Sequence, residues 1–232
     1  MRLNGFIDLL FPPVCPLCEE AFSEREFCAA CESALALTRI DGPACNVCGC
    51  PFISASSGPH TCGTCLKEPP PYLQAVSACR YEGKMRDAIH AFKFNAQVHL
   101  AAGLASIAET AARFNIRPQI IMPVPLHISR LRQRGFNQSL LIAAEIAGAH
   151  SIPLDYTSIT RLRHTAPQSG LKAVDRHLNV KGAFAVTRPD LLKDRHVLLV
   201  DDVLTTGSTI TECAATLKSA GAAVYVLTLA RV

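Results

Sequence analysis

The chain has 232 residues, of which 49% are hydrophobic and 18% charged, a composition typical of folded globular proteins and unlike that of disordered ones. The length suffices for one α/β domain and a small additional module. A formal net charge of +4 is compatible with phosphate-bearing ligands, but it is too small to indicate nucleic-acid binding by itself.

The first eleven residues contain a short apolar stretch that Asp8 interrupts, and no cleavage site of small residues follows it. These features differ from those of a secretory signal peptide. No apolar run approaches the roughly 20 residues of a membrane span. We therefore expect a short N-terminal helix packed on the protein, a cytoplasmic location and no membrane insertion.

Nine of the eleven cysteines lie between Cys15 and Cys65, and eight of them form four CxxC pairs in series. A CxxC turn directs two thiolates at one point, so two such turns complete a tetrahedral sulfur site. The simplest pairing joins successive turns and predicts two structural zinc ions. Their ligands would be Cys15, Cys18, Cys28 and Cys31 for the first ion, and Cys45, Cys48, Cys62 and Cys65 for the second.

Spacing alone leaves other arrangements open. A crossed pairing would join the first turn to the third, and Cys50 offers a substitute ligand for the second site. A disulfide framework would need an oxidising compartment, and a redox dithiol normally has a single CxxC beside a βαβ unit. The segment has too few apolar residues for a core of its own, so we expect it to fold only with metal.

Three consecutive prolines, at 69–71, form a stiff extended segment after which cysteines almost cease. We therefore predict a zinc-binding double-knuckle module at residues 1–68, a linker at 69–72 and an α/β domain at 73–232. The domain begins with a strand and turn at Tyr81, followed by an amphipathic helix. Lys84, Arg86 and Lys93 in that helix would add positive charge to a site or simply face solvent. Residues 100–114 and 139–149 predict two more helices with apolar faces.

Residues 120–125 predict a short strand that ends in a rigid Pro-x-Pro turn. The basic loop after it carries three arginines at alternate positions, Arg130, Arg132 and Arg134. Because a guanidinium can donate two parallel hydrogen bonds to phosphate oxygens, this loop is a candidate phosphate-binding site. A solvated basic loop, or a patch for nucleic-acid phosphates, is the alternative. Further along, the polar segment 161–179 predicts a loop, in which His164 and His177 are candidate acid/base groups.

The apolar run at 197–200 predicts a strand buried on both faces, as in parallel sheets. Asp201 and Asp202 follow it, at the end of the strand where ligands bind in open α/β sheets. A tight turn then opens a helix over 210–220, and residues 224–229 predict another buried strand. The turn consists of Thr205, Thr206, Gly207, Ser208 and Thr209.

This arrangement suits a ribose 5-phosphate. Asp201 and Asp202 can accept hydrogen bonds from two neighbouring ribose hydroxyls, directly or through Mg²⁺. The turn and the positive N-terminal end of the helix can bind the phosphate, and Gly207 allows the close approach of the backbone. The alternative is an acidic pair of the kind found in phosphoacceptor domains, followed by an ordinary helix cap.

The full string from 197 to 209 resembles the phosphoribosyl-diphosphate (PRPP) binding signature of type I phosphoribosyltransferases. The resemblance implies a parallel sheet flanked by helices, with Asp201 and Asp202 as catalytic residues that hold ribose and Mg²⁺. It also implies that the arginine loop receives pyrophosphate and that the segment 161–179 is a mobile loop covering the sugar.

Over nearly its full length the chain resembles the ComF family, including its GntX-like members. The motifs that carry this resemblance are the cysteine turns, Tyr81-Glu82-Gly83, Pro123-Val124-Pro125-Leu126, Arg134-Gly135-Phe136-Asn137-Gln138, Pro167-Gln168 and Val200-Asp201-Asp202-Val203. The resemblance implies a bacterial protein linked to DNA uptake in natural competence or to the use of external DNA, with PRPP, single-stranded DNA and competence proteins as candidate partners.

Phosphoribosyl transfer itself stays open, because no motif identifies an acceptor. A second hypothesis is a non-enzymatic single-stranded-DNA handling factor regulated by PRPP or a nucleotide. A third is a zinc-dependent platform for protein partners. Residues 19–26, between the first two cysteine turns, are acidic. This argues against DNA contact there, because nucleic-acid-binding knuckles normally carry basic and aromatic residues.

Overall fold

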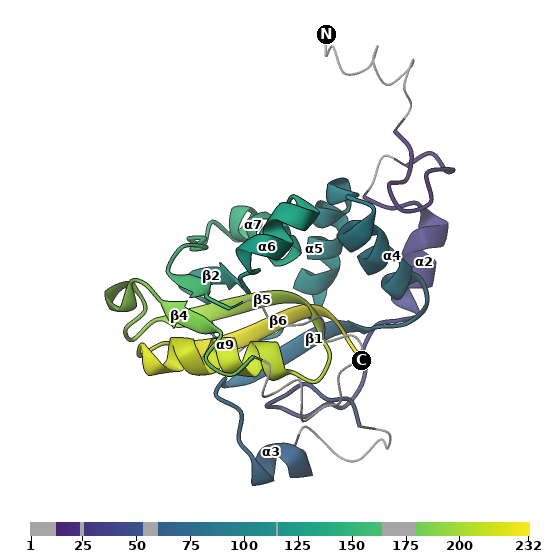
Figure 1. Ribbon diagram of the computed structural model, residues 1–232. Helices are drawn as coiled ribbons and strands as arrows, with labels where there is room; N and C mark the ends of the chain where they lie inside the picture. The colour runs from purple at the N-terminus through teal and green to yellow at the C-terminus, as the bar shows by residue number, and fades with distance from the viewer. Residues whose placement is uncertain (1–12, 24–25, 53–59, 115, 164–179) are drawn as a thin grey trace.

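The computed structural model describes residues 13–23, 26–52, 60–114, 116–163 and 180–232 (Figure 1). The expected N-terminal helix lies outside them, and so do His164, His177 and most of the polar loop at 161–179. Among the described residues, none of the helices has both the length and the apolar character that a membrane span requires.

The centre of the fold is a four-stranded parallel sheet with the strand order β1-β6-β5-β2. Its strands are β1 (Gln74–Arg80), β2 (Ile120–Pro123), β5 (His196–Leu204) and β6 (Ala223–Arg231). The two middle strands, β5 and β6, are buried along most of their length, as expected for near-continuous apolar strands. A separate antiparallel pair is formed by β3 (Ile159–Arg161) and β4 (Phe184–Val186).

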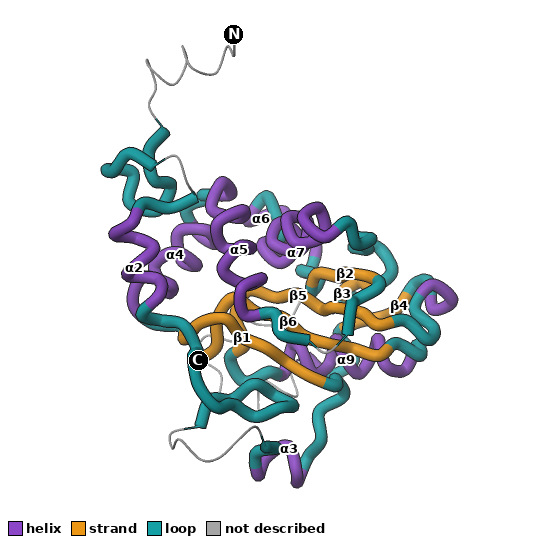
Figure 2. Tube along the Cα trace, turned by 180° about the vertical axis from the view of Figure 1, so that it is seen from behind, coloured by secondary structure: helices purple, strands orange, loops and turns teal. Residues whose placement is uncertain are grey.

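Helices cover both faces of the sheet (Figures 1 and 2). On one face α4 (Gly83–Phe94), α5 (Ala101–Ala111) and α7 (Gln138–His150) enclose the first hydrophobic core. On the other face α9 (Ser208–Ser219) and the β3–β4 pair enclose a second core. A parallel sheet between two layers of this kind confirms the predicted α/β class with flanking helices.

Two elements differ from the sequence-based expectation. The strand β5 does not end before the aspartates but continues to Leu204, because its pairing with β6 extends from His196↔Ala223 to Leu204↔Arg231. The helix expected from residue 100 begins as the 3₁₀ turn η1 (Val98–Leu100), and α5 ends at Ala111. A short 3₁₀ turn, η2 (Pro189–Leu191), precedes β5.

The basic segment predicted as a loop is instead the helix α6 (Ile128–Arg134). His127 caps its start, since the ring Nδ1 accepts a hydrogen bond from Ser129 N at 3.2 Å. Gly135 ends it in the left-handed region at φ 84°, which a residue without Cβ adopts at little cost. Side chains two positions apart therefore point to different sides of α6, whereas those four apart share a side.

The cysteine-rich segment packs on the sheet in two units. The first cysteine unit (residues 13–38) includes α2 (Ala29–Ala36), which contacts α4, and its Phe27 and Leu35 are part of the first core. The second cysteine unit (residues 44–67) includes α3 (Gly63–Lys67), and its Val47 packs against the second core. The apolar residues of this segment thus extend the two main cores instead of forming a separate one.

Both cysteine units and the connector between them contact the edge strand β1. Arg80 N donates to Thr38 O at 2.7 Å and Ile40 N donates to Ala78 O at 3.0 Å. At the other end of the strand, Ala75 N donates to Val47 O at 2.7 Å. Since the two units join opposite cores, they hold β1 from opposite faces of the sheet.

Candidate functional site

Each cysteine unit brings four thiols together at one point. The Sγ atoms of Cys15, Cys18, Cys28 and Cys31 lie within 4.8 Å of one another, and so do those of Cys45, Cys48, Cys62 and Cys65. All eleven cysteines are free of disulfides. The structure therefore brings successive turns together and not crossed ones, and Cys50 lies outside the second cluster.

The distances within the clusters fit zinc. A tetrahedral site with Zn–S bonds of about 2.3 Å has edges of about 3.8 Å, and the Sγ atoms of Cys18 and Cys28 lie 3.9 Å apart. Backbone N–H groups of Cys48 and Cys62 approach Cys45 Sγ at 3.5 and 3.3 Å. Although burial opposes ionisation, such donors lower the pKa of Cys45 to about 6. The two tetrads indicate two structural zinc sites, with all four positions taken by sulfur.

A second group of predicted residues surrounds a cavity of about 290 Å³ at the carboxyl ends of β2 and β5. Four cationic side chains from three helices or strands line it: Lys93 of α4, Arg130 and Arg134 of α6, and Arg161 of β3. Arg130 and Arg134 are four positions apart and share one side of α6. Arg132 lies on the other side of this helix and does not line the cavity.

Hydrogen bonds and an ion pair fix the positions of the two aspartates in the cavity wall. Asp201 Oδ1 accepts hydrogen bonds from Ser139 Oγ at 2.8 Å and from Asp202 N at 2.9 Å. Asp202 Oδ2 lies 2.7 Å from Lys93 Nζ. Both carboxyl groups line the cavity. Carboxylate oxygens in this position suit a hydroxyl group or a hard cation such as Mg²⁺.

The electrostatics of the cavity favour an anionic ligand. Desolvation and the neighbouring Asp202 carboxylate raise the pKa of Asp201 to about 7, against the opposing effects of Ser139 and Lys93. Desolvation lowers the pKa of Arg134, but a guanidinium remains protonated at neutral pH. Four cationic side chains thus line the cavity with two carboxyl groups, of which Asp201 is only partly ionised at neutral pH.

The turn after β5 brings a helix N-terminus to the cavity. Thr205 and Thr209 line the cavity, whereas Thr206, Gly207 and Ser208 complete the turn behind them. Gly207 has φ 78° and caps α9, whose first residue is Ser208. The first N–H groups of this helix have no acceptor within the helix, which makes its N-terminal end suitable for a phosphate.

A second helix N-terminus borders the same cavity. Asn137 caps α7, since its Oδ1 accepts from Ser139 N at 3.1 Å, while its Nδ2 donates to Val124 O at 3.1 Å. The side chains of Gln138 and Ser139, the first two residues of α7, line the cavity together with Val124. The two helix ends therefore enclose the acidic pair.

The sequence had not singled out all of these residues. Lys93 was predicted either to add positive charge to a site or to face solvent, and Gln138, Ser139 and Arg161 had no assigned role. The asparagine before the apolar pattern of α7 is an N-cap signal that places Gln138 and Ser139 at a helix start. For Arg161 no local pattern gives such a signal.

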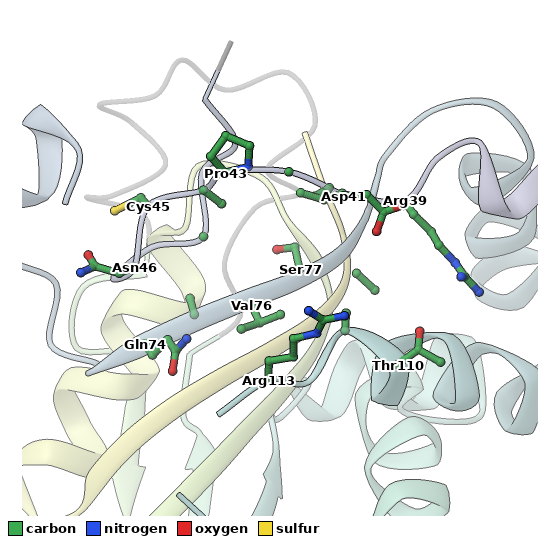
Figure 3. Close-up of a pocket in the computed structure, with 17 residues that line it drawn as sticks. Arg39, Asp41, Pro43, Cys45, Asn46, Gln74, Val76, Ser77, Thr110 and Arg113 are labelled. Carbon is green, nitrogen blue, oxygen red and sulfur yellow. The ribbon is translucent and has the colours of Figure 1, made fainter. Parts of the chain in front are cut away.

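A larger cavity, of about 1070 Å³, lies between the connector of the cysteine units, β1 and the end of α5 (Figure 3). Arg39 reaches it from the connector and Arg113 from the segment after α5. Asn46, Gln74 and Thr110 also line it. It contains none of the residues that carry the phosphate-binding pattern, so the two cavities are separate candidate sites.

Two family models match separate parts of the chain. Residues 6–66 match the family model of a double zinc ribbon domain, and residues 137–231 match that of a phosphoribosyl transferase domain. The chain is 35% identical over 223 residues to the DNA utilization protein YhgH of Escherichia coli, covering 93% of this chain and 95% of that protein.

Two competence proteins are also similar. Competence protein F of Haemophilus influenzae is 37% identical over 168 residues, which cover 69% of this chain and 73% of that protein. Competence protein ComFC of Bacillus subtilis is 26% identical over 234 residues, covering 92% of each.

Proposed function

Because the chain belongs to the ComF family, which joins a zinc-binding segment to a phosphoribosyltransferase-type domain, we propose that it binds PRPP with Mg²⁺ and acts in the uptake or use of external DNA. The names of the relatives support the association with DNA. The cavity at the end of β5 supports PRPP as the ligand.

The observation that carries this proposal is the pair of helix N-termini on either side of the aspartates. PRPP is a sugar with a phosphate at one end and a diphosphate at the other, and the cavity offers a positive helix end to each. Thr205 to Thr209 and the start of α9 would bind the 5-phosphate. The start of α7 with Arg130 and Arg134 would bind the diphosphate.

Asp201 and Asp202 would then accept hydrogen bonds from the ribose hydroxyls between the two anionic ends. Their oxygens are also the ligand type that Mg²⁺ prefers, and a magnesium ion bound there would neutralise charge on the diphosphate. Lys93 already neutralises one oxygen of Asp202. The acidic pair can therefore remain next to a polyanion.

Transfer of the phosphoribosyl group would break the bond between the anomeric carbon and the diphosphate oxygen, and the bonding electrons would leave with the diphosphate. Arg130 and Arg134 would stabilise the charge that develops on this leaving group. Asp201 and Asp202 would hold the ribose while an acceptor attacks the anomeric carbon. The acceptor has no assigned pocket, and binding without transfer would make the same site a PRPP sensor.

Calorimetric titration of the zinc-loaded protein with PRPP and Mg²⁺ tests this function. We expect saturable binding that the Asp201→Ala/Asp202→Ala variant loses. Asp190→Ala, at an exposed position of η2, is the matched control and should bind like the unchanged protein. Absence of PRPP binding to the folded protein would overturn the assignment of the ligand.

Direct contact with single-stranded DNA is a second candidate function, and the larger cavity favours it. Arg39 and Arg113 are both among its lining residues (Figure 3), and guanidinium groups bind phosphodiesters well. The Arg39→Ala/Arg113→Ala variant should bind a fluorescent oligonucleotide more weakly. The plot of the logarithm of its association constant against the logarithm of the salt concentration should be less steep by about 1.4. Lys218→Ala, at an exposed position of α9, is the control.

A further inference from the structure

Gln138 is a buried amide whose donor has no partner. The side chain is 1% exposed, and Nε2 makes no hydrogen bond within the part of the chain that the structure describes. Buried polar groups are nearly always hydrogen-bonded. Because Gln138 lines the 290 Å³ cavity, an acceptor on a bound ligand would satisfy this donor.

The position of Gln138 is fixed by its two neighbours. Asn137 is tied to Val124 O by its side chain and caps α7, and Ser139 Oγ donates to Asp201 Oδ1 at 2.8 Å. Gln138 is the first of the thirteen residues of α7. Its amide therefore lies at the helix end where the unpaired N–H groups concentrate positive charge.

The charge around Gln138 indicates which part of the ligand lies there. Arg130 and Arg134 line the same cavity, whereas Thr205 and Thr209 line it next to α9, which packs on the other face of the sheet from α7. An acceptor next to two guanidinium groups and a helix N-terminus is anionic. If the 5-phosphate of PRPP binds at the N-terminus of α9, the diphosphate of PRPP lies at the N-terminus of α7.

We propose that Gln138 Nε2 donates a hydrogen bond to an oxygen of the diphosphate of bound PRPP. Gln138 would thereby make the site bind PRPP more tightly than ribose 5-phosphate, which has no diphosphate. This inference rests on the proposed PRPP-binding function and adds a specificity-determining residue to it. Leucine has a similar volume and would leave no donor unpaired in the empty cavity. The amide thus stabilises the complex at the expense of the empty protein.

This trade-off makes the role testable against a purely structural one. We compare Gln138→Leu and the unbranched Gln138→Met with the unchanged protein. The control is Gln133→Leu, which introduces the same residue at an exposed position of α6. The thermal midpoint is measured without ligand, and Kd values are measured with Mg²⁺ for PRPP, inorganic diphosphate and ribose 5-phosphate. The expected result is an unchanged or higher midpoint, about tenfold weaker binding of PRPP and diphosphate, and unchanged binding of ribose 5-phosphate.

The outcomes separate this inference from the function on which it rests. PRPP affinity that is equal in Gln138→Leu and the unchanged protein would overturn the role of Gln138 alone. A lower midpoint with equal losses for PRPP and ribose 5-phosphate would also overturn it, because the residue would then be structural. If the unchanged protein binds neither PRPP nor diphosphate, both proposals are overturned. Diphosphate binding that Gln138→Leu weakens would support the subsite even if PRPP did not bind.

Discussion

Lys93 Nζ lies 2.7 Å from Asp202 Oδ2, which joins the last turn of α4 to the carboxyl end of β5. The two side chains are only 18% and 11% exposed, so solvent screens this ion pair far less than a surface pair. The cation that would contact an anionic ligand thus also holds one of the two acids in place.

Lys93→Met should therefore lower the free energy of unfolding, because it leaves the Asp202 carboxylate without its cation in a largely desolvated position. We expect a loss of about 2 kcal/mol in urea titrations, together with weaker PRPP binding. Lys84→Met, in the first turn of the same helix, should change neither quantity appreciably. Equal stability of both variants would mean that the ion pair contributes nothing.

The helical phase of α6 predicts different roles for its arginines. Arg134→Ala should weaken PRPP binding about tenfold, because a charge-assisted hydrogen bond to the ligand is lost. Arg132→Ala removes the same charge from the other side of the helix and should change Kd less than about twofold, which corresponds to less than about 0.4 kcal/mol. Calorimetry at one salt concentration measures both, and a larger effect of Arg132→Ala would contradict this assignment.

These results show which features of the fold are encoded locally. Three features could be predicted because residues close in the sequence determine them. They are the buried strand β5, the CxxC turns and the turn around Gly207. The helix α6 was missed because only Ile128 and Leu131 are apolar in it and no periodicity emerges; its start and end depend on His127 and Gly135. Lys93 and Arg161 reach the cavity from distant segments, and only tertiary packing brings them there.

The pairing of the cysteine turns predicts the zinc content of single variants. Because the two clusters share no ligand, Cys15→Ser and Cys45→Ser should each reduce bound zinc from two ions per chain to one. Cys50→Ser should retain both ions. Metal analysis of the purified proteins by mass spectrometry checks this, and loss of both ions from either single-site variant would show that the clusters depend on each other.

Gly103 of α5 lets the first cysteine unit approach closely. A Cβ atom at this position would lie 2.5 Å from Cε2 and Cζ of Phe27, whose ring is buried in the first core. Alanine raises helix propensity by about 1 kcal/mol, but overpacking costs about 1–3 kcal/mol, so Gly103→Ala should destabilise the protein on balance.

The control for this substitution is Gly148→Ala in α7, where a Cβ atom meets no neighbour within 4 Å. Here only the helix propensity changes, and we expect stabilisation of about 0.5–1 kcal/mol. Opposite signs for the two substitutions in chemical denaturation would establish the close contact. A gain of stability in both would show that the Phe27 ring moves aside easily.

The raised pKa of Asp201 makes stability depend on pH. The carboxyl group ionises near 3.9 in an unfolded chain and at about 7 in the folded protein, so the folded state binds more protons between these values. Its contribution to stability is complete below about pH 4 and is lost as the pH rises through 7.

Asp201→Asn cannot ionise, so its thermal midpoint relative to that of the unchanged protein should rise by at least about 2–4 °C between pH 5 and pH 8. The measurement is made in magnesium-free buffer, in which no bound cation compensates the carboxylate. A difference in midpoint that is the same at both pH values would contradict the raised pKa.

The hydrogen bonds between the two cysteine units and β1 also have a consequence for folding during translation. Within the four-stranded sheet β1 pairs only with β6, which leaves the ribosome long after β1, whereas the cysteine units precede β1 in the chain. Zinc binding can therefore fold the two units around β1 and cover its exposed edge during translation. The metal sites would then keep β1 in an ordered, protected conformation until β6 has been synthesised and can pair with it.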